Sequence, residues 1–232
     1  MKLQATLTAA LLLAAPLTGV WAQSLDGFAT TARNNNLMYE VTITNITRGS
    51  LFTPILVASH RPGVELFTLG HPASPALADL AEGGDIMPLM DMLSMDSNVV
   101  GIGDSGGPLL PGQSVTVRVP AGNANRISLA AMILPTNDGF IALNGAEIPR
   151  SGSQTFMVPG YDAGSEPNDE SCNHIPGPQC GGEGEGVSPE TDDDEGFVHV
   201  HAGIHGIGDL AAADYDWRNP MAVVTVQKVR QP

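Results

Sequence analysis

Residues 39–47 read Tyr-Glu-Val-Thr-Ile-Thr-Asn-Ile-Thr, and this stretch decides the fold class. Apolar and polar residues alternate along it with a period of two, which is the side-chain period of a β-strand with one buried face. The β-branched residues in it favour the same extended backbone. The stretch therefore predicts a half-buried strand, and such a strand needs partner strands from the rest of the chain.

Seven segments further along predict those partners, because each is short, largely apolar and bounded by Gly, Pro or Asn. They are residues 52–59, 114–119, 126–134, 140–143, 155–158, 197–201 and 221–229. Between residues 72 and 95, Ala, Leu and Met take helical spacing, which Pro72, Pro75 and Pro88 divide into short pieces. The pattern predicts an all-β protein, an antiparallel β-sandwich of about eight strands with short helical insertions.

The first 22 residues have the composition of a secretory signal peptide. Lys2 precedes an apolar run at residues 7–17, and Val20-Trp21-Ala22 is typical of a cleavage site. The run is shorter than the roughly 20 residues that cross a bilayer, and no later stretch approaches that length. We expect cleavage after Ala22, a flexible lead-in at residues 23–37, one domain at residues 38–232, and a secreted or periplasmic location.

The charge of the chain is strongly negative and concentrated. Lys and Arg total 10 against 25 Asp and Glu, which repels nucleic acid and anionic lipid headgroups but leaves cations and basic surfaces as partners. Many of the acids lie in residues 160–196, a loop long enough to be either functional or a solvated flap. Cys172 and Cys180 also lie there, and in an oxidising compartment they predict a disulfide.

Residues 103–109 read Gly-Asp-Ser-Gly-Gly-Pro-Leu, the nucleophile segment of chymotrypsin-like serine proteases. In those enzymes a histidine from an earlier barrel takes the proton of the serine. Too little chain precedes Ser105 for such a barrel, and neither His60 nor His71 has the sequence setting of that histidine. We interpret the segment as a Gly-rich turn and do not expect protease activity.

Several motifs resemble the spondin domain family, in particular its bacterial single-domain members. They are Asn45-Ile46-Thr47, Phe52-Thr53-Pro54, Ala58-Ser59-His60, Pro72-Ala73-Ser74, and residues 80–85, 132–140, 161–166, 197–201 and 203–206. The resemblance runs from about residue 39 to residue 229. It implies an eight-stranded antiparallel sandwich and, in the animal F-spondin type, matrix adhesion with a bound calcium ion.

Two departures from the animal members matter. Gly139 stands where their motif has Trp, and the thrombospondin-type modules that accompany their spondin domains are absent. Matrix adhesion itself therefore does not carry over.

Calcium takes six to eight oxygen ligands and favours irregular loops that supply them. If residues 126–134 run up a sheet, residues 140–143 run down and residues 155–158 return, then Asp138 and Asp162 lie at the same end. The resemblance implies these two as calcium ligands, with Glu166 as the last acid of the second motif; Asp169 and Glu170 are nearby candidates without that support. Grouped carboxylates repel one another unless a cation neutralises them, although solvated loop acids remain the alternative.

A second constellation is formed by His199, His201 and His205. On a strand His199 and His201 share a face, and His205 follows the Gly203 turn, so the three rings could hold zinc or copper. The alternative is paired histidines that hydrogen-bond loop carbonyls. Asp209, Asp214 and Asp216 follow as residues that could orient such ligands or cap a helix.

The sequence favours a secreted, non-catalytic, calcium-binding module with a binding, cell-adhesion or cell-surface structural role. Its partner would be an extracellular or cell-surface protein or glycan. The alternative is a metal-dependent hydrolase that uses His199, His201 and His205 around zinc or copper. A third hypothesis is an exported structural domain in which a metal only stiffens loops.

Overall fold

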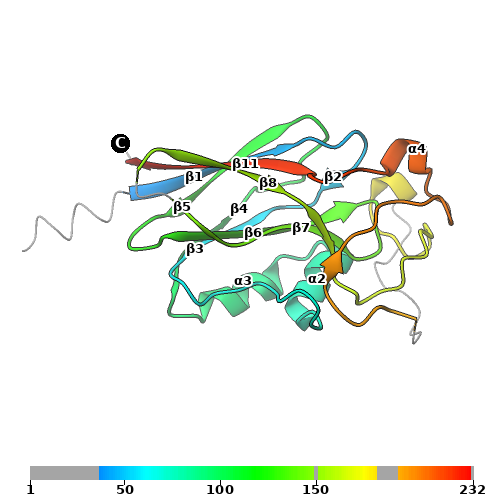
Figure 1. Cartoon of the computed structure of the whole chain (residues 1–232), viewed down its shortest axis with the longest axis horizontal. Helices are drawn as coiled ribbons and strands as arrows, with labels where there is room; N and C mark the ends of the chain where they lie inside the picture. The colour runs from blue at the N-terminus through cyan, green and yellow to red at the C-terminus, as the bar shows by residue number, and fades with distance from the viewer. Residues whose placement is uncertain (1–36, 149–150, 182–192, 231–232) are drawn as a thin grey trace, which may run out of the picture.

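The computed structural model describes residues 37–148, 151–181 and 193–230. The expected signal peptide, nearly all of the expected lead-in and the acidic stretch at residues 182–192 lie outside the described residues. Within them the chain forms a sandwich of two antiparallel sheets, which confirms the predicted fold class (Figure 1).

The first sheet has four strands in the order β5-β1-β11-β8. Their bounds are β1 Leu37–Asn45, β5 Ser114–Pro120, β8 Ser153–Val158 and β11 Ala222–Arg230. Tyr39, Val41 and Ile43 of β1 face the core, and Thr42 between them contacts the Thr116 hydroxyl on the outer face at 2.8 Å. The alternation of apolar and polar residues in residues 39–47 is therefore that of a strand with one buried face.

The second sheet follows the order β10-β9-β7-β6-β3-β4, and the short strand β2 pairs with β6 beside it. The bounds are β2 Leu51–Phe52, β3 Leu56–His60, β4 Val99–Asp104, β6 Arg126–Leu134, β7 Gly139–Glu147, β9 Gly160–Asp162 and β10 His199–Val200. The predicted strand at residues 52–59 is thus two strands interrupted at Pro54. β4 was not predicted, and the predicted strand at residues 197–201 shrinks to two residues.

Two helices cover the outer face of the second sheet, α2 Pro75–Gly83 and α3 Met87–Ser94 (Figure 1). The Ser74 hydroxyl caps α2 by accepting from the Leu77 N–H, and Gly84 ends the helix in the left-handed conformation. Leu77, Leu80, Leu89 and Leu93 pack with Leu56, Ala130 and Phe140 of the sheet. Because helices bury one face and the other sheet buries the opposite face, β6 is apolar along nearly its whole length.

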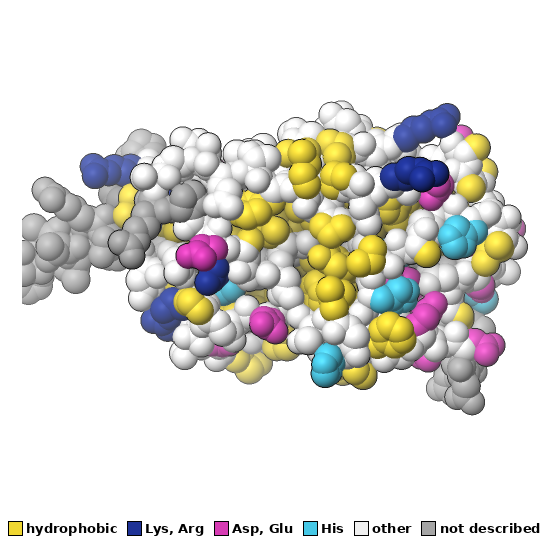
Figure 2. Space-filling view, viewed as in Figure 1, with side chains coloured by type: hydrophobic (Ala, Val, Ile, Leu, Met, Phe, Trp, Pro, Cys, Tyr) yellow, Lys and Arg dark blue, Asp and Glu magenta, His cyan; other side chains and the backbone are white. Residues whose placement is uncertain are grey.

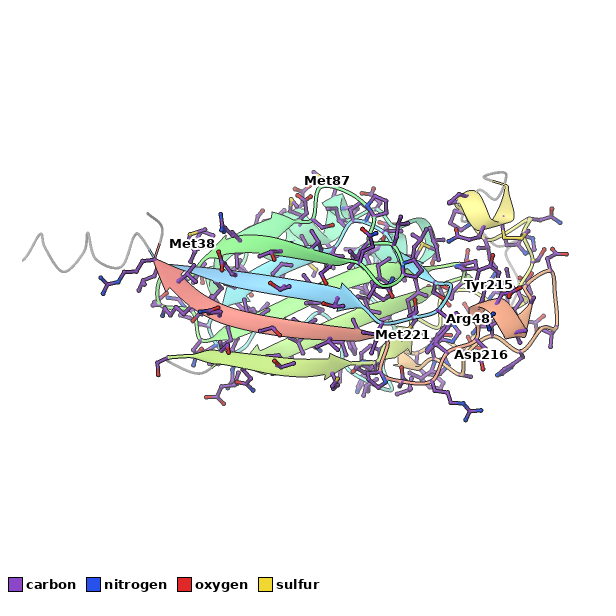
Figure 3. All side chains as sticks on the ribbon, turned by 90° about the horizontal axis from the view of Figure 1, so that it is seen from above. Met38, Arg48, Met87, Tyr215, Asp216 and Met221 are labelled. Carbon is purple, nitrogen blue, oxygen red and sulfur yellow. A yellow bond between two sulfur atoms is a disulfide. The ribbon has the colours of Figure 1, made fainter. Side chains whose placement is uncertain are left out.

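The long loops that follow β9 and β10 gather at one end of the sandwich (Figure 1). Figure 3 looks onto the four-stranded sheet, with Met38 at one end and Met221 at the other, where Arg48, Tyr215 and Asp216 also lie. This loop end also holds the 3-10 turn η1 Pro178–Cys180 and the short helix α4 Ala212–Tyr215. None of the described helices has the length and apolar character needed to cross a membrane.

Candidate metal centre and adjoining cavity

Asp138 and Asp162 meet at the loop end of the second sheet. Asp138 closes the turn between β6 and β7, and β9 pairs with β7 in a register that sets Asp162 opposite Gly139. The backbone N–H of Ala163 donates to the Asp138 carbonyl at 3.2 Å. The structure therefore brings these two predicted residues together at one end of the sandwich, as the up-and-down strand directions predict.

The Asp138 side chain is fully buried and only half satisfied. Its Oδ2 accepts the backbone N–H groups of Ser165 at 2.8 Å and Glu166 at 3.1 Å. Its Oδ1 is buried and has no hydrogen-bond partner among the described residues. A buried carboxylate oxygen without a donor is costly, so this atom faces a position that a proton or a cation can occupy.

Asp162 is also fully buried and has two hydrogen bonds. Its Oδ1 accepts from the Gly164 N–H at 2.8 Å, and its Oδ2 accepts from the Asn168 amide at 2.7 Å. Two imidazoles flank it, with His199 Nδ1 3.6 Å from Oδ1 and His201 Nε2 3.9 Å from Oδ2.

The electrostatics of the pair favour neutralisation. Burial raises the pKa of Asp138 to about 8, with the charge of Asp162 acting in the same direction, despite the hydrogen bonds from Ser165 and Glu166. Burial also raises the pKa of Asp162, although the Asn168 amide and the His199 charge oppose it. Two adjacent carboxylates removed from water are more stable when they share a proton or a cation than when both carry an uncompensated negative charge.

Further acids surround the pair. Glu166 is buried, and its backbone N–H is the one that donates to Asp138. Glu82, near the end of α2, was not predicted: burial raises the pKa of its carboxyl, and a hydrogen bond with the Ser165 side chain opposes that rise. The motif at residues 80–85, which carried part of the family resemblance, contains Glu82 and was the available signal.

Glu170 holds the loop that carries His205. It is buried and has a left-handed backbone, with φ 54°. Its carboxylate accepts three backbone N–H groups in succession, from His205 at 2.5 Å, Gly206 at 2.8 Å and Ile207 at 2.9 Å. The carboxylate of Glu170 is thus committed to positioning a loop.

Asp169 is likewise engaged within the loop. Burial alone would raise its pKa, but hydrogen bonds from the Ser171 N–H, the Asn137 amide and the His174 ring outweigh burial and lower the pKa. The His174 Nδ1 lies 2.5 Å from its Oδ2.

The three predicted histidines line one cavity of about 230 Å³ next to Asp162. Acidic and histidine side chains are visible toward this end in Figure 2. His201 Nδ1 accepts the Gly203 N–H at 3.0 Å, whereas His199 Nδ1 lies 3.1 Å from the Phe197 carbonyl, and His205 is exposed. Among residues 37–148, 151–181 and 193–230, no three His, Cys, Asp or Glu side chains converge as a metal-ligand group.

The remaining candidates have structural contacts. Cys172 and Cys180 form the predicted disulfide. Asp209 accepts from the Cys172 N–H, Asp216 accepts from the Ile204 N–H, and Asp214 lies 3.9 Å from Arg48.

Ser105 lies in a turn after β4. Its hydroxyl donates to the Gly107 carbonyl at 2.7 Å and accepts from the Ile55 N–H at 2.8 Å. His60 instead contacts the Ser128 hydroxyl and the Arg61 carbonyl, and His71 is exposed on a loop. Neither histidine has a hydrogen bond to Ser105.

Comparison with known proteins adds one finding. A family model described as Spondin_N matches residues 39–168, a range that includes Asp138, Asp162 and Glu166 and ends before the histidines of the cavity. No curated protein matches the chain.

Proposed function

Because the chain belongs to the Spondin_N family, we propose that it is a secreted, non-catalytic module whose loop end is stabilised by a calcium ion at Asp138 and Asp162. Its role is binding or adhesion at the cell exterior. Glu166 is the third candidate ligand, because it lies in the loop whose backbone N–H groups donate to Asp138 Oδ2.

The observation that carries this proposal is the pair of fully buried aspartates with one oxygen, Asp138 Oδ1, that receives no hydrogen bond from the described part of the chain. Folding alone does not favour such an arrangement, because both the desolvation and the mutual repulsion oppose it. A divalent cation would supply the missing positive charge. The residues fit a calcium ion because the atoms available to bind it are carboxylate oxygens in an irregular loop, and calcium prefers such ligands.

The histidine-based hydrolase receives no such support. With His201 Nδ1 accepting a backbone N–H, the proton of a neutral ring sits on Nε2, the nitrogen nearest to Asp162. A nitrogen that carries a proton is not a metal ligand. The residues therefore favour an oxygen-ligated ion over zinc or copper, and a module over an enzyme.

The test is the thermal unfolding of purified protein with chelator, with added calcium, and with zinc as a comparison. An ion at one hundred times its dissociation constant stabilises the folded state by about 2.7 kcal/mol, which for a domain of this size is a rise of roughly 5–10 °C in Tm. Asp138→Asn and Asp162→Asn should lose the calcium response. Asp91→Asn, on the exposed face of α3, is the matched control and should keep it.

Two results would count against the proposal. One is a Tm that is indifferent to both chelator and calcium. The other is stoichiometric zinc or copper in elemental analysis of the purified protein, which would instead favour the histidine cavity as the metal site.

Export is part of the same proposal. The disulfide between Cys172 and Cys180 supports it, because such bonds persist in oxidising compartments. Terminal sequencing of the protein recovered from periplasm or medium should begin at Gln23, and recovery of the uncleaved chain from the cytoplasm would contradict it.

A further inference from the structure

The cavity beside Asp162 contains a buried donor that no residue in the described part of the chain satisfies. The His201 side chain is 2% exposed and lines the cavity, and its Nε2 has no hydrogen-bond partner within residues 37–148, 151–181 and 193–230. Its Nδ1 accepts the Gly203 N–H, so this ring carries its proton on Nε2. A buried N–H group is almost always paired, so its partner should be an atom that enters the cavity.

The surroundings restrict what that atom is. The nearest acceptor, Asp162 Oδ2, lies 3.9 Å from Nε2, beyond hydrogen-bond reach. An oxygen placed between the two would accept from His201 and donate to Asp162. A ligand carboxylate would meet repulsion from Asp162, and an ammonium group cannot accept from His201. A neutral hydroxyl group satisfies both sides.

The rest of the cavity suits a ligand with several hydroxyl groups. Asn168 and Glu195 line it and supply amide and carboxylate oxygens, next to the rings of His199 and His205. The Phe197 ring is 42% exposed and lies 5.5 Å, centroid to centroid, from the ring of His199, which lines the cavity. A single water would satisfy His201 but would gain nothing from the exposed apolar ring that packs against His199.

We propose that this cavity binds a neutral sugar unit of a glycan, with one sugar hydroxyl bridging His201 Nε2 and Asp162 Oδ2 and the apolar face of the sugar against Phe197. The inference rests on the binding role proposed above and names its ligand class. The hydroxyl bridge shares Asp162 with the proposed calcium site, and titrations with and without calcium separate the two proposals.

The experiment is a calorimetric titration of the full mature chain with glucose, mannose, galactose, fucose and N-acetylglucosamine, each with and without calcium, and with glycerol as an acyclic polyol. At least one cyclic sugar should bind, and glycerol should bind at least tenfold more weakly. His201→Phe keeps a ring of similar shape but removes the donor, so it should weaken binding by about tenfold or more. The matched control His71→Phe, at an exposed loop position, should bind as the parent chain does.

Two readouts keep the test decisive if His201→Phe folds poorly. Histidine side-chain NMR spectra of the parent chain should show the His201 resonances moving during the sugar titration while those of His174 stay in place. Phe197→Ala, at an exposed position, should also weaken binding.

The proposal is overturned if no sugar of the panel binds, or if binding leaves the His201 resonances unchanged, since the cavity would then hold only water. A calcium-dependent rise in Tm without sugar binding would retain the proposed calcium site and remove this inference. Sugar binding without a calcium response would do the reverse.

Discussion

Asp138 should make the calcium-free protein less stable as the pH rises. Its folded-state pKa is about 8 against an ordinary 3.8, so between these values the folded chain holds a proton that the unfolded chain has lost. Stability rises with pH only where the unfolded state binds more protons than the folded state. Here the folded state binds more protons than the unfolded state. The free energy of unfolding should therefore fall as the pH rises through this window.

His201 acts in the opposite direction over part of that window. Burial, with the charges of His199 and His205, lowers the pKa of His201 from 6.5 to about 3, so stability gained from it increases with pH up to about 6.5 and then stays constant. The clean range for the Asp138 effect is therefore pH 6.5–8. Denaturant unfolding in chelator should show a decline across that range, smaller in Asp138→Asn and smaller with saturating calcium. A flat profile for the parent chain would show that Asp138 is ionised throughout.

Glu170 offers a second prediction at single-residue scale, because one carboxylate satisfies three backbone donors. Glu170→Ala would strand the N–H groups of residues 205–207 and should destabilise the protein by about 2–4 kcal/mol, since each unsatisfied buried group costs about 1–3 kcal/mol and some gain access to water. Glu170→Gln retains one acceptor oxygen and should lose less. Urea denaturation gives both values. Glu65→Ala, at an exposed position, is the control, and an equal effect there would remove the special role of Glu170.

The residues that sequence reasoning found differ in kind from those it missed. Strand direction predicted that Asp138 and Asp162 share one end of the sandwich, but β8 lies in the other sheet, and the unpredicted pairing of β9 with β7 makes them neighbours. Glu82 was missed, and Glu170 was named only as a further calcium candidate, because both act through tertiary contacts, with Ser165 and with the loop after Gly203, that no local pattern encodes. Which nitrogen of His201 carries the proton depends on one backbone N–H from Gly203, a contact that no sequence pattern encodes.

At the scale of elements, the strands with alternating or strongly apolar patterns were predicted and the irregular ones were not. β4 reads Val-Val-Gly-Ile-Gly-Asp, and its two glycines hide the strand pattern. Gly101 is required there, because a Cβ would lie 2.4 Å from the Pro120 ring. Gly139 has a similar reason: a Cβ would lie 2.9 Å from the His201 ring and 2.7 Å from the Thr136 hydroxyl, so this chain has no room for the Trp of the animal motif.

The turn after β4 yields a prediction about Ser105. Because its hydroxyl both accepts from Ile55 and donates to Gly107, Ser105→Ala should cost about 1 kcal/mol of unfolding free energy through the lost turn bonds. Incubation with a fluorophosphonate probe should leave Ser105 unlabelled, since no histidine hydrogen-bonds to it. Exposed Ser94→Ala is the matched control for stability. Stoichiometric labelling of Ser105 would reverse the interpretation of the segment as a turn.

At the scale of the whole molecule, the chain divides into a packed sandwich and a loop end that depends on a few polar side chains. The sandwich buries apolar residues from both sheets, including Tyr39, Phe52 and Ile127. The loop end is held mainly by backbone N–H groups that converge on Asp138, Asp162 and Glu170, together with the disulfide. The two parts should respond differently to loss of a cation.

Hydrogen exchange measures that difference directly. Calcium should raise the protection of amides in residues 163–174 and 197–207, because an ion bound to Asp138 and Asp162 holds together the loops that carry and contact them. Amides of β1 and β11, whose ladder joins residues 37–45 to 222–230, should exchange at the same slow rate with or without the ion. In Asp138→Asn the loop amides should no longer respond to calcium. Equal changes across both parts would mean that the ion stabilises the fold as one unit, and the division between scaffold and loop end would then be wrong.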